Sequence, residues 1–344
     1  MKRWLMGSLL ILAALAAGAG GAAWLIDTRA HEPFVGGGQA ELFVEIPAGT
    51  SPAGIGQRLV DAGVVRDRLT FRAAVWLTGQ ARQLKAGEYR FDRPLSAVEV
   101  VDTLARGDVF RRLLTIREGL TIAEMAAVFE ERGFGAASDF IAAAGHAELI
   151  HTIDPGARDL EGYLFPETYA LPRGTPAAEV VSQMVQAFAR AFDPDLRAAA
   201  AAQGLTVREA VTLASLVEKE TATADERPIV AAVYRNRLRI KMGMQADPTV
   251  IYALQQAGTY RGNISKADLQ VDSPYNTYRY PGLPPGPIAA PGLAALQAVA
   301  RPADVRFLYF VSRNDGTHAF ASTLAEHNRN VRTWQVEYFR KRKR

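Results

Sequence analysis

The chain has 344 residues, of which 49% are hydrophobic and 22% charged; these proportions are typical of folded proteins, and the length suffices for two domains, which excludes a disordered chain. The formal net charge is +4, but much of the excess lies in the terminal run 340–344 and in scattered arginines, which disfavours a nucleic-acid partner. The absence of cysteine excludes disulfides, zinc-thiolate sites and thiol nucleophiles.

The N-terminus predicts a membrane anchor over residues 1–27. Residues 4–26 are 23 uncharged positions, long enough as a helix to cross a hydrocarbon core of about 30 Å. Lys2 and Arg3 precede this run, and by the positive-inside tendency they stay in the cytoplasm; this predicts a single-pass protein of the cell (inner) membrane whose body lies outside the cytoplasm. The alternative is a cleaved signal peptide, because residues 17–19 resemble a cleavage site. In both cases the body is exported.

Residues 28–40 contain a proline and three consecutive glycines, and they predict a short flexible tether. After it, two stretches align with each other without a gap, residues 46–64 and 116–134. Each begins like a strand, turns at a glycine, offers a Ser or Thr as helix N-cap, continues with apolar positions at helical spacing and ends at a glycine. The pattern predicts one local unit of strand, turn and short helix that is used twice.

The first of these units belongs to a small module over residues 41–110. With a second predicted helix around 70–78 and a strand around 87–91, it resembles the LysM-like modules that bind the N-acetylglucosamine of glycans. The alternative is a generic β-α unit without glycan contact. Beyond residue 133 the chain becomes mainly helical. Local signals there predict a helix after the capping box Thr206–Glu209, a second after Pro228, a third with Asp247 as N-cap, a hairpin with strands over 306–312 and 318–321, and a last helix capped by Thr323.

A candidate catalytic group follows the most periodic part of the chain. The helix that begins after Thr206 runs through the apolar stretch 210–217 into Glu218, Lys219 and Glu220. A carboxyl group at the edge of a dry helix face has its charged form destabilised and its pKa raised, so it can hold a proton and donate it to a glycosidic oxygen. Periodicity does not distinguish Glu218 from Glu220, and a solvated carboxylate at a helix end remains the alternative for either.

Five separated motifs together resemble the YceG-like family of endolytic murein transglycosylases, and the resemblance covers nearly the whole chain. In chain order they are LEGYLFPETY over 160–169, LASLVEKET over 213–221, MQADPTV over 244–250, SPYNTY over 273–278 and GLPPGPI over 282–288.

The resemblance implies that Glu218 is the single catalytic acid of a lytic enzyme. It would protonate the oxygen between N-acetylmuramic acid and N-acetylglucosamine, and then accept the proton of the muramyl C6 hydroxyl. The product would be a 1,6-anhydromuramyl end, formed on nascent glycan strands without water, and the cut would terminate their elongation. The resemblance also suggests membrane peptidoglycan polymerases as partners, beside the glycan strands.

The expected substrate-binding residues come mainly from the loop 273–292. This loop is dense in Pro and Gly and therefore stiff, and it carries aromatic and amide groups suited to stacking on sugar rings and bonding N-acetyl groups. One residue of the third motif and one of the first complete the set. The expected substrate-binding residues are Gln245, Tyr275, Asn276, Thr277 and Glu161.

Patterns for other chemistries are missing from the sequence. The five histidines show no metal-binding spacing, and neither a Gly-rich phosphate loop nor a serine-hydrolase elbow occurs, so we expect no metal and no cofactor. We interpret His318, on the predicted hairpin, as structural. Two alternatives remain: a non-catalytic glycan-binding scaffold for the polymerases, and a muramidase that uses water and a second carboxylate, with Glu161, Glu220 and Asp247 as candidates.

We therefore predict an α+β protein with four parts. Residues 1–27 form the membrane anchor, 28–40 the tether, 41–110 the LysM-like β-α module, and 111–344 a mixed α/β catalytic domain that holds Glu218 in a substrate groove.

Overall fold

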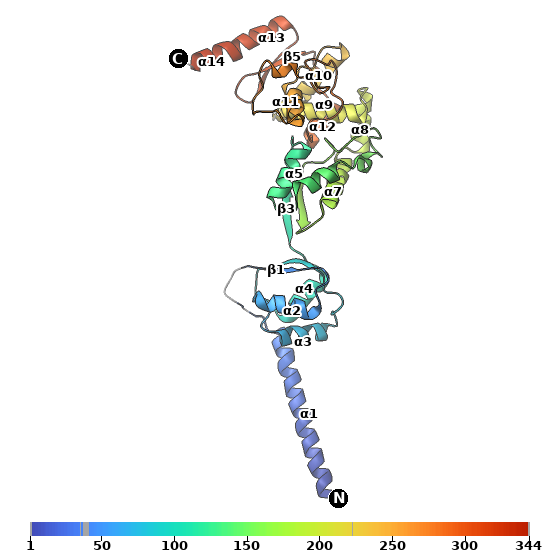
Figure 1. Ribbon diagram of the computed structural model, residues 1–344, viewed down its shortest axis with the longest axis vertical. Helices are drawn as coiled ribbons and strands as arrows, with labels where there is room; N and C mark the ends of the chain where they lie inside the picture. The colour runs from blue at the N-terminus through green and yellow to red at the C-terminus, as the bar shows by residue number, and fades with distance from the viewer. Residues whose placement is uncertain (1, 35, 37–40, 222, 343–344) are drawn as a thin grey trace. The chain divides into compact units, whose positions relative to one another are not determined.

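The computed structural model describes residues 2–34, 36, 41–221 and 223–342, without the side chains of residues 2–14, 16 and 19. The fold is mixed α/β, with helices and small two-stranded sheets (Figure 1). The chain divides into two compact units. Unit 1 comprises Met1–Leu113 with Ala170–Arg173, and unit 2 comprises Leu114–Tyr169 with Gly174–Arg344.

The first helix, α1 (Lys2–His31), is 30 residues long and extends four residues into the segment expected to be a tether. Its last turn is not free, because Ala30 is completely buried in the core of unit 1. Within the part of the chain that the structure describes, no helix combines the length and the apolar character needed to cross a membrane. Most side chains of the expected span 4–26 are not among those that the structure describes. The membrane anchor therefore stays a prediction.

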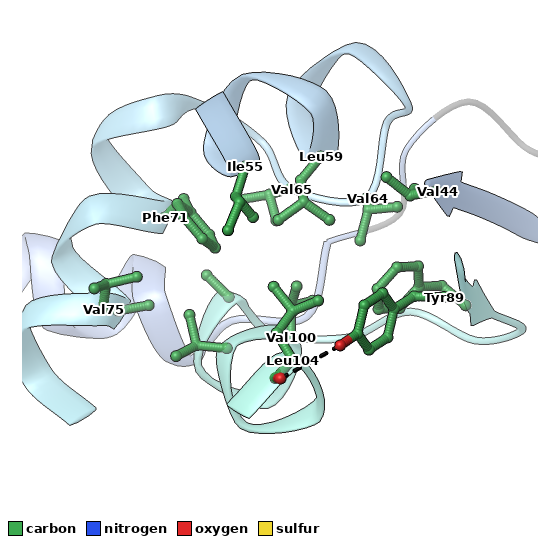
Figure 2. Close-up of a cluster of buried hydrophobic side chains, with 14 of the residues drawn as sticks. Val44, Ile55, Leu59, Val64, Val65, Phe71, Val75, Tyr89, Val100 and Leu104 are labelled. Atoms are coloured by element: carbon green, nitrogen blue, oxygen red, sulfur yellow. Dashed lines mark hydrogen bonds between the residues drawn. The ribbon is translucent and has the colours of Figure 1, made fainter. Parts of the chain in front are cut away.

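Unit 1 is built on an antiparallel pair of strands, β1 (Leu42–Ile46) and β2 (Gly87–Phe91). In their register Val44 lies directly across from Tyr89. Helices α2 (Pro52–Asp61) and α3 (Arg68–Thr78) lie between the strands in sequence, and α4 (Ala97–Arg106) follows them. Figure 2 shows the core that these elements enclose. Its members include Ile55, Leu59, Phe71, Val75, Val100 and Leu104, with the Tyr89 hydroxyl donating to the Leu104 carbonyl oxygen at 3.4 Å.

The strand, turn and helix predicted twice are both present. The first copy is β1 and α2, and the second is β3 (Arg111–Thr115) and α5 (Ile122–Glu131). Ser51 and Thr121 cap the two helices, each accepting a hydrogen bond from a backbone N–H in the first turn. Each copy ends at a glycine with φ of +73°, a left-handed conformation that glycine adopts at little cost. The prediction of a repeated local unit is confirmed.

Unit 2 is mainly helical, and α9 (Val207–Glu220) packs against four other helices, α8, α10, α11 and α12. Residues 210–217 of α9 are all buried, which makes it the central helix of this unit. Strand β4 (Thr168–Pro172) pairs with β3, and β5 (Tyr309–Ser312) and β6 (His318–Ala321) form an antiparallel hairpin. The remaining elements are α6 (Ala137–Ala144), η1 (Ala147–Ile150), α7 (Ala177–Ala191), α8 (Pro194–Ala202), η2 (Ala224–Glu226), α10 (Arg227–Arg239), α11 (Asp247–Gln256), η3 (Asp268–Gln270), α12 (Leu293–Ala300), α13 (Leu324–Val331), η4 (Arg332–Glu337) and α14 (Tyr338–Arg342).

The helix starts of unit 2 largely follow the sequence signals. Capping boxes at Thr206 and Thr323 are confirmed, as is the hairpin. The expected N-cap role of Asp247 is wrong. The helix α11 begins at this residue with Ala246 as its N-cap, and the Asp247 carboxylate instead accepts a hydrogen bond of 2.6 Å from the Tyr278 hydroxyl. The Asp247 carboxylate thus bonds the Tyr278 hydroxyl, 31 positions along the chain, and not the backbone N–H groups of its own helix.

A partly buried ion pair fixes the start of α9. Asp154 accepts hydrogen bonds from Nε and Nη2 of Arg208 at 2.9 and 3.0 Å, and a third from the Tyr163 hydroxyl. Burial alone would raise the pKa of Asp154, but the hydrogen bonds from Arg208 and Tyr163 outweigh it and hold the pKa below its usual value. The first turn of α9 is thereby attached to residues 154–163.

Replacing Asp154→Asn should lower the free energy of unfolding by about 2 kcal/mol at neutral pH, because the substitution leaves the partly exposed Arg208 guanidinium without its counter-charge. A depressed carboxyl pKa contributes stability above the unfolded value of 3.8 and loses it as the pH falls below that value. The difference between the two proteins should therefore shrink under acid. Denaturant unfolding of the full chain measures it, with the exposed Asp304→Asn as control. Equal stability of the two proteins at neutral pH would contradict this account.

Candidate active site

Glu218 lies in the last turn of α9, directly after the buried stretch 210–217. The helix carries its carboxyl group to the edge of the apolar core, where its side chain is only 6% exposed. One oxygen, Oε2, accepts a hydrogen bond of 3.0 Å from the Gly292 N–H. The other, Oε1, lies 3.7 Å from Nη2 of Arg227, too far for a hydrogen bond. The carboxyl group is thus desolvated and bonded by a single backbone donor.

These surroundings raise the pKa of Glu218 above the ordinary value of 4.5. Burial is the largest cause; the Gly292 N–H opposes it, the negative charge of Glu118 raises the pKa further, and Arg227 lowers it. A carboxyl group in this setting keeps its proton to higher pH than an exposed one, and it can donate that proton to a group beside it.

Glu118 is a carboxylate that the sequence analysis did not single out. It lies in the turn between β3 and α5, and hydrogen bonds between this turn and the chain before α12 hold it beside Gly292: the Gly119 N–H donates to the Ala290 oxygen at 2.8 Å, and the Ala290 N–H to the Leu120 oxygen at 2.9 Å. Lys219 of α9 adds a hydrogen bond of 3.0 Å from Nζ to the Gly119 oxygen. Two carboxyl groups, those of Glu118 and Glu218, therefore lie against the same segment.

Gly292 is the point at which these two carboxyl groups meet. Its φ of −76° and ψ of 171° are accessible to any residue, so backbone conformation does not require glycine here. The Glu118 side chain, however, occupies the position that a Cβ of residue 292 would take. The repeat contained a signal for Glu118: in the alignment of the two copies it stands opposite Ala48, so the second copy has a carboxylate where the first has a methyl group.

Arg227 is a second residue that the sequence analysis missed. It begins α10, whose start Pro228 predicted, and its side chain is 12% exposed. Its Nε is buried and makes no hydrogen bond to any residue that the structure describes. A buried donor of this kind is costly unless it finds a partner, so the guanidinium beside Glu218 is suited to bind a polar ligand group.

Glu220, the other carboxylate at the end of α9, has a different environment. It accepts a hydrogen bond of 2.7 Å from the buried Tyr234 hydroxyl. Burial raises the pKa of Glu220, the hydrogen bond from the Tyr234 hydroxyl lowers it, and the negative charge of Asp247 raises it further. Glu220 is therefore bonded by a buried tyrosine hydroxyl and Glu218 by a single backbone N–H, a difference that periodicity did not predict.

Glu161 is 7% exposed and caps a helix from outside it. Its carboxyl oxygens accept from the Ile122 N–H at 3.2 and 3.3 Å, at the start of α5, and from the Tyr252 hydroxyl at 3.2 Å. Burial raises its pKa to about 8, against the Ile122 hydrogen bond. The Tyr252 ring lies 4.9 Å from that of Tyr275. Glu161 and Tyr275, two of the expected substrate-binding residues, therefore belong to one cluster.

Asn276 and Thr277 are enclosed, with 0% and 2% exposure. Asn276 donates from Nδ2 to two backbone oxygens at 2.8 and 3.0 Å and accepts from the Tyr278 N–H at 3.0 Å, which uses all but one of its hydrogen-bonding positions. The Thr277 hydroxyl accepts from the Ala246 N–H at 3.0 Å. In this structure both side chains hold the loop 273–292 in place.

Two expected substrate-binding residues have accessible side chains. Tyr275 is half-buried, and Gln245 is exposed. Gln245 has a φ of +49°, an uncommon conformation for a residue with a side chain, and its N–H donates to the Thr277 oxygen at 3.4 Å. Such backbone strain is frequent at functional sites. Substrate contact by Gln245 and Tyr275 stays a prediction.

His318 makes its side-chain contact with a glutamate of the fold. Its Nδ1 lies 2.7 Å from Oε2 of Glu226, and its N–H donates to Oε1 at 2.8 Å, which ties the hairpin to the start of α10. Among the described residues, no group of three or more His, Asp or Glu side chains is arranged to hold a metal ion.

Comparison with known proteins decides the family, because the YceG-like family model matches residues 44–333. The chain belongs to the YceG-like family. The endolytic murein transglycosylase of Bacillus subtilis is 29% identical over 328 residues, which cover 90% of this chain and 89% of that protein. The endolytic murein transglycosylase of Streptococcus pneumoniae serotype 2 is 32% identical over 364 residues; the match covers 96% of this chain but 65% of that longer protein.

A solved structure of the same family supports the fold. The crystal structure of a putative YceG-like protein from Listeria monocytogenes matches with a TM-score of 0.58 and 30% identity, covering 84% of this chain and 98% of that one. The resemblance predicted from the five sequence motifs is confirmed.

Replacing Glu118→Gln should lower the pKa of Glu218, because it removes a negative charge and changes side-chain size little. The chain labelled with carboxyl-¹³C glutamate allows the titration to be followed by NMR, and the resonance lost in Glu218→Gln identifies the group. Glu131→Gln, at the far end of α5, is the matched control and should leave the midpoint unchanged. An unchanged midpoint in Glu118→Gln would show that the two carboxyl groups are not coupled.

The raised pKa of Glu161 predicts a pH dependence of stability. A carboxyl group whose folded pKa is about 8 contributes stability below its unfolded pKa, and this contribution is lost as the pH rises through 8. The melting temperature should therefore fall between pH 5 and pH 9, and Glu161→Gln, which cannot ionise, should fall less. A variant with the same slope as the parent would mean that Glu161 remains ionised in the folded protein.

Proposed function

We propose that this protein is an endolytic murein transglycosylase, which cuts the β-1,4 bond between N-acetylmuramic acid and N-acetylglucosamine within glycan strands and thereby ends their elongation. The observation that carries the proposal is the state of Glu218: a desolvated carboxyl group with raised pKa, bonded by one backbone N–H. The relatives from Bacillus subtilis and Streptococcus pneumoniae bear the name of this activity.

The reaction needs one group that first gives and then takes a proton. Protonated Glu218 donates its proton to the glycosidic oxygen while the bond from that oxygen to the muramyl C1 breaks. The muramyl C6 oxygen then bonds to C1, and the proton of the C6 hydroxyl passes to the Glu218 carboxylate. Glu218 regains its proton, no water is consumed, and the new end is a 1,6-anhydromuramyl residue.

The neighbours of Glu218 suit both halves of this cycle. Burial and the charge of Glu118 favour the protonated form that begins the reaction. Once the proton has left, the Gly292 N–H and the Arg227 guanidinium stabilise the carboxylate that remains. Glu218 thus has neighbours that favour each of its two protonation states, which suits a group that acts as acid and base in turn.

For the muramidase alternative, the structure suggests a different second carboxylate from those first considered. Of the carboxylates first considered, Glu161, Glu220 and Asp247 each accept a hydrogen bond from a tyrosine hydroxyl. Glu118 is instead the carboxylate beside Glu218, and a water held by it would give hydrolysis. The mass of the product separates the two reactions, because the anhydro end lacks one water.

The remaining parts of the chain fit this activity. We propose that α1 anchors the protein in the cell membrane with unit 1 and unit 2 outside the cytoplasm, where nascent strands and their polymerases are found. The order β1, α2, α3, β2 in unit 1 supports a LysM-like role in glycan binding. Membrane peptidoglycan polymerases are the proposed partners, and unit 2 supplies the substrate groove.

The decisive experiment is mass spectrometry of fragments released from purified peptidoglycan by the full-length chain. Wild type should release anhydromuramyl ends, and Glu218→Gln should lose roughly 10² to 10⁴ of this activity, because it cannot transfer a proton. Glu131→Gln, an exposed glutamate at the end of α5, is the control for charge loss. Reducing ends would identify a muramidase, and binding without release by wild type would identify a scaffold.

A further inference from the structure

Helix α3 is apolar on two sides. Its inner side, with Phe71, Ala74 and Val75, packs into the core of unit 1. On the opposite side Leu69 and Trp76 are 77% and 79% exposed. Helices with apolar residues on all sides are normally covered on all sides. The side of α3 with Leu69 and Trp76 is therefore apolar but is not packed against other parts of the fold.

The exposed residues form one continuous strip. Leu69, Arg72 and Trp76 follow each other at intervals of three and four, which places them on one side of the helix. Arg68, four positions before Arg72, and Leu77, next to Trp76, border them, and the five residues are here called the outer face of α3. All five are exposed. An isolated exposed leucine is ordinary, but a strip of apolar side chains marks an interaction surface, and the two arginines give this one a positive charge.

The end of α1 lies beside this face. Ala30, in the last turn of α1, is completely buried in the core that also contains Phe71 and Val75 of α3. Just beyond, Glu32 pairs with Arg66 at 3.0 Å. The helix α1 is therefore joined to the folded unit by packing rather than by a flexible tether, and α3 lies at the C-terminal end of α1 (Figure 1).

A cleft between the two helices links their apolar residues. It is lined by Trp24 and Ile26 from the end of the uncharged run of α1, and by Leu69, Trp76 and Leu77 from α3. Arg29 and Arg72 contribute positive charges to its lining, and Asp27 and Asp67 contribute negative ones, so the net positive charge of the outer face comes from Arg68 and Arg72 on the helix itself. The exposed apolar residues of α3 are therefore level with the place where the uncharged run of α1 ends.

We propose that the outer face of α3 lies in the headgroup region of the membrane, next to the point where α1 leaves it, and that it binds anionic lipids. The proposal rests on the proposed role of α1 as anchor. Trp76 would take the interfacial position that indoles favour, and Leu69 and Leu77 would reach the acyl boundary. Arg68 and Arg72 would bind lipid phosphates. Unit 1 would then lie directly on the bilayer.

The absence of cysteine from the sequence makes the test direct. Single nitroxide labels are placed on Leu69→Cys and, in a second protein, Trp76→Cys, and each full-length chain is reconstituted into vesicles of phosphatidylcholine and phosphatidylglycerol. Leu113→Cys is the matched control, because Leu113 is another leucine of unit 1 that is 62% exposed. Power-saturation EPR then compares the access of oxygen and of a water-soluble nickel chelate.

Labels at positions 69 and 76 should be at least severalfold less accessible to the chelate than the label at position 113, and more accessible to oxygen. Equal accessibility at all three positions, in chains that float with the vesicles, would overturn the membrane face and leave the anchor standing. Chains that do not float with vesicles would overturn both. Protection that persists in detergent, with dipolar coupling between labels, would assign the face to a second copy of the chain and also overturn the proposal.

The lipid preference has its own variant. Replacing Arg68→Gln and Arg72→Gln together in the labelled chain should raise chelate access at position 69 in anionic vesicles, and should have little effect in pure phosphatidylcholine. Equal access before and after the replacement in anionic vesicles would remove the anionic lipid from the proposal.

Discussion

The removal of water from one carboxyl group is the constraint on which the site depends. Helix α9 is buried along residues 210–217, and its register brings Glu218 to the surface of the core as the helix ends. A carboxyl group placed there loses hydration that a single N–H from Gly292 does not replace. The same packing that stabilises unit 2 therefore raises the pKa of Glu218, so the stability of the core and the chemistry of the site have one origin.

The two copies of the strand, turn and helix unit show how one local structure is used for two purposes. Both copies have a capped helix and a left-handed glycine at its end, and their backbones follow the same rules. They differ in the turn, where Ala48 of the first copy corresponds to Glu118 of the second. In unit 2 this turn is bonded to the segment before α12, so its carboxyl group lies against Gly292, whose N–H bonds Glu218. In unit 1 the corresponding helix α2 helps to enclose an apolar core.

Several polar residues of the family motifs act within the fold. Asn276 and Thr277 bond the loop 273–292 to itself and to Ala246, and Glu161 bonds the start of α5. A buried amide or carboxyl group of this kind fixes the position of a loop more narrowly than apolar packing does, because its hydrogen bonds are directional. Gln245 and Tyr275 are carried by this framework and remain accessible to a ligand. The buried polar residues and the accessible ones therefore have complementary tasks.

Local signals in the sequence were enough for several of the elements and for the family. Capping boxes, glycine C-caps and hairpin chemistry act within a few residues, so they predicted α2, α5, α9, α13 and the β5–β6 hairpin, and five motifs predicted the YceG-like family. Contacts between distant segments were decided only by the tertiary structure. It gave Glu218 and Glu220 different hydrogen-bond partners, placed Glu118 and Arg227 beside Glu218, bonded Asp247 to Tyr278 instead of to the helix cap, and buried the end of α1 where a tether was expected. The physical reason is that burial and charge proximity set a pKa or select a hydrogen-bond partner, and both depend on residues far apart in the chain. Asp247 and Tyr278 are 31 positions apart, and Glu118 and Glu218 are 100 apart.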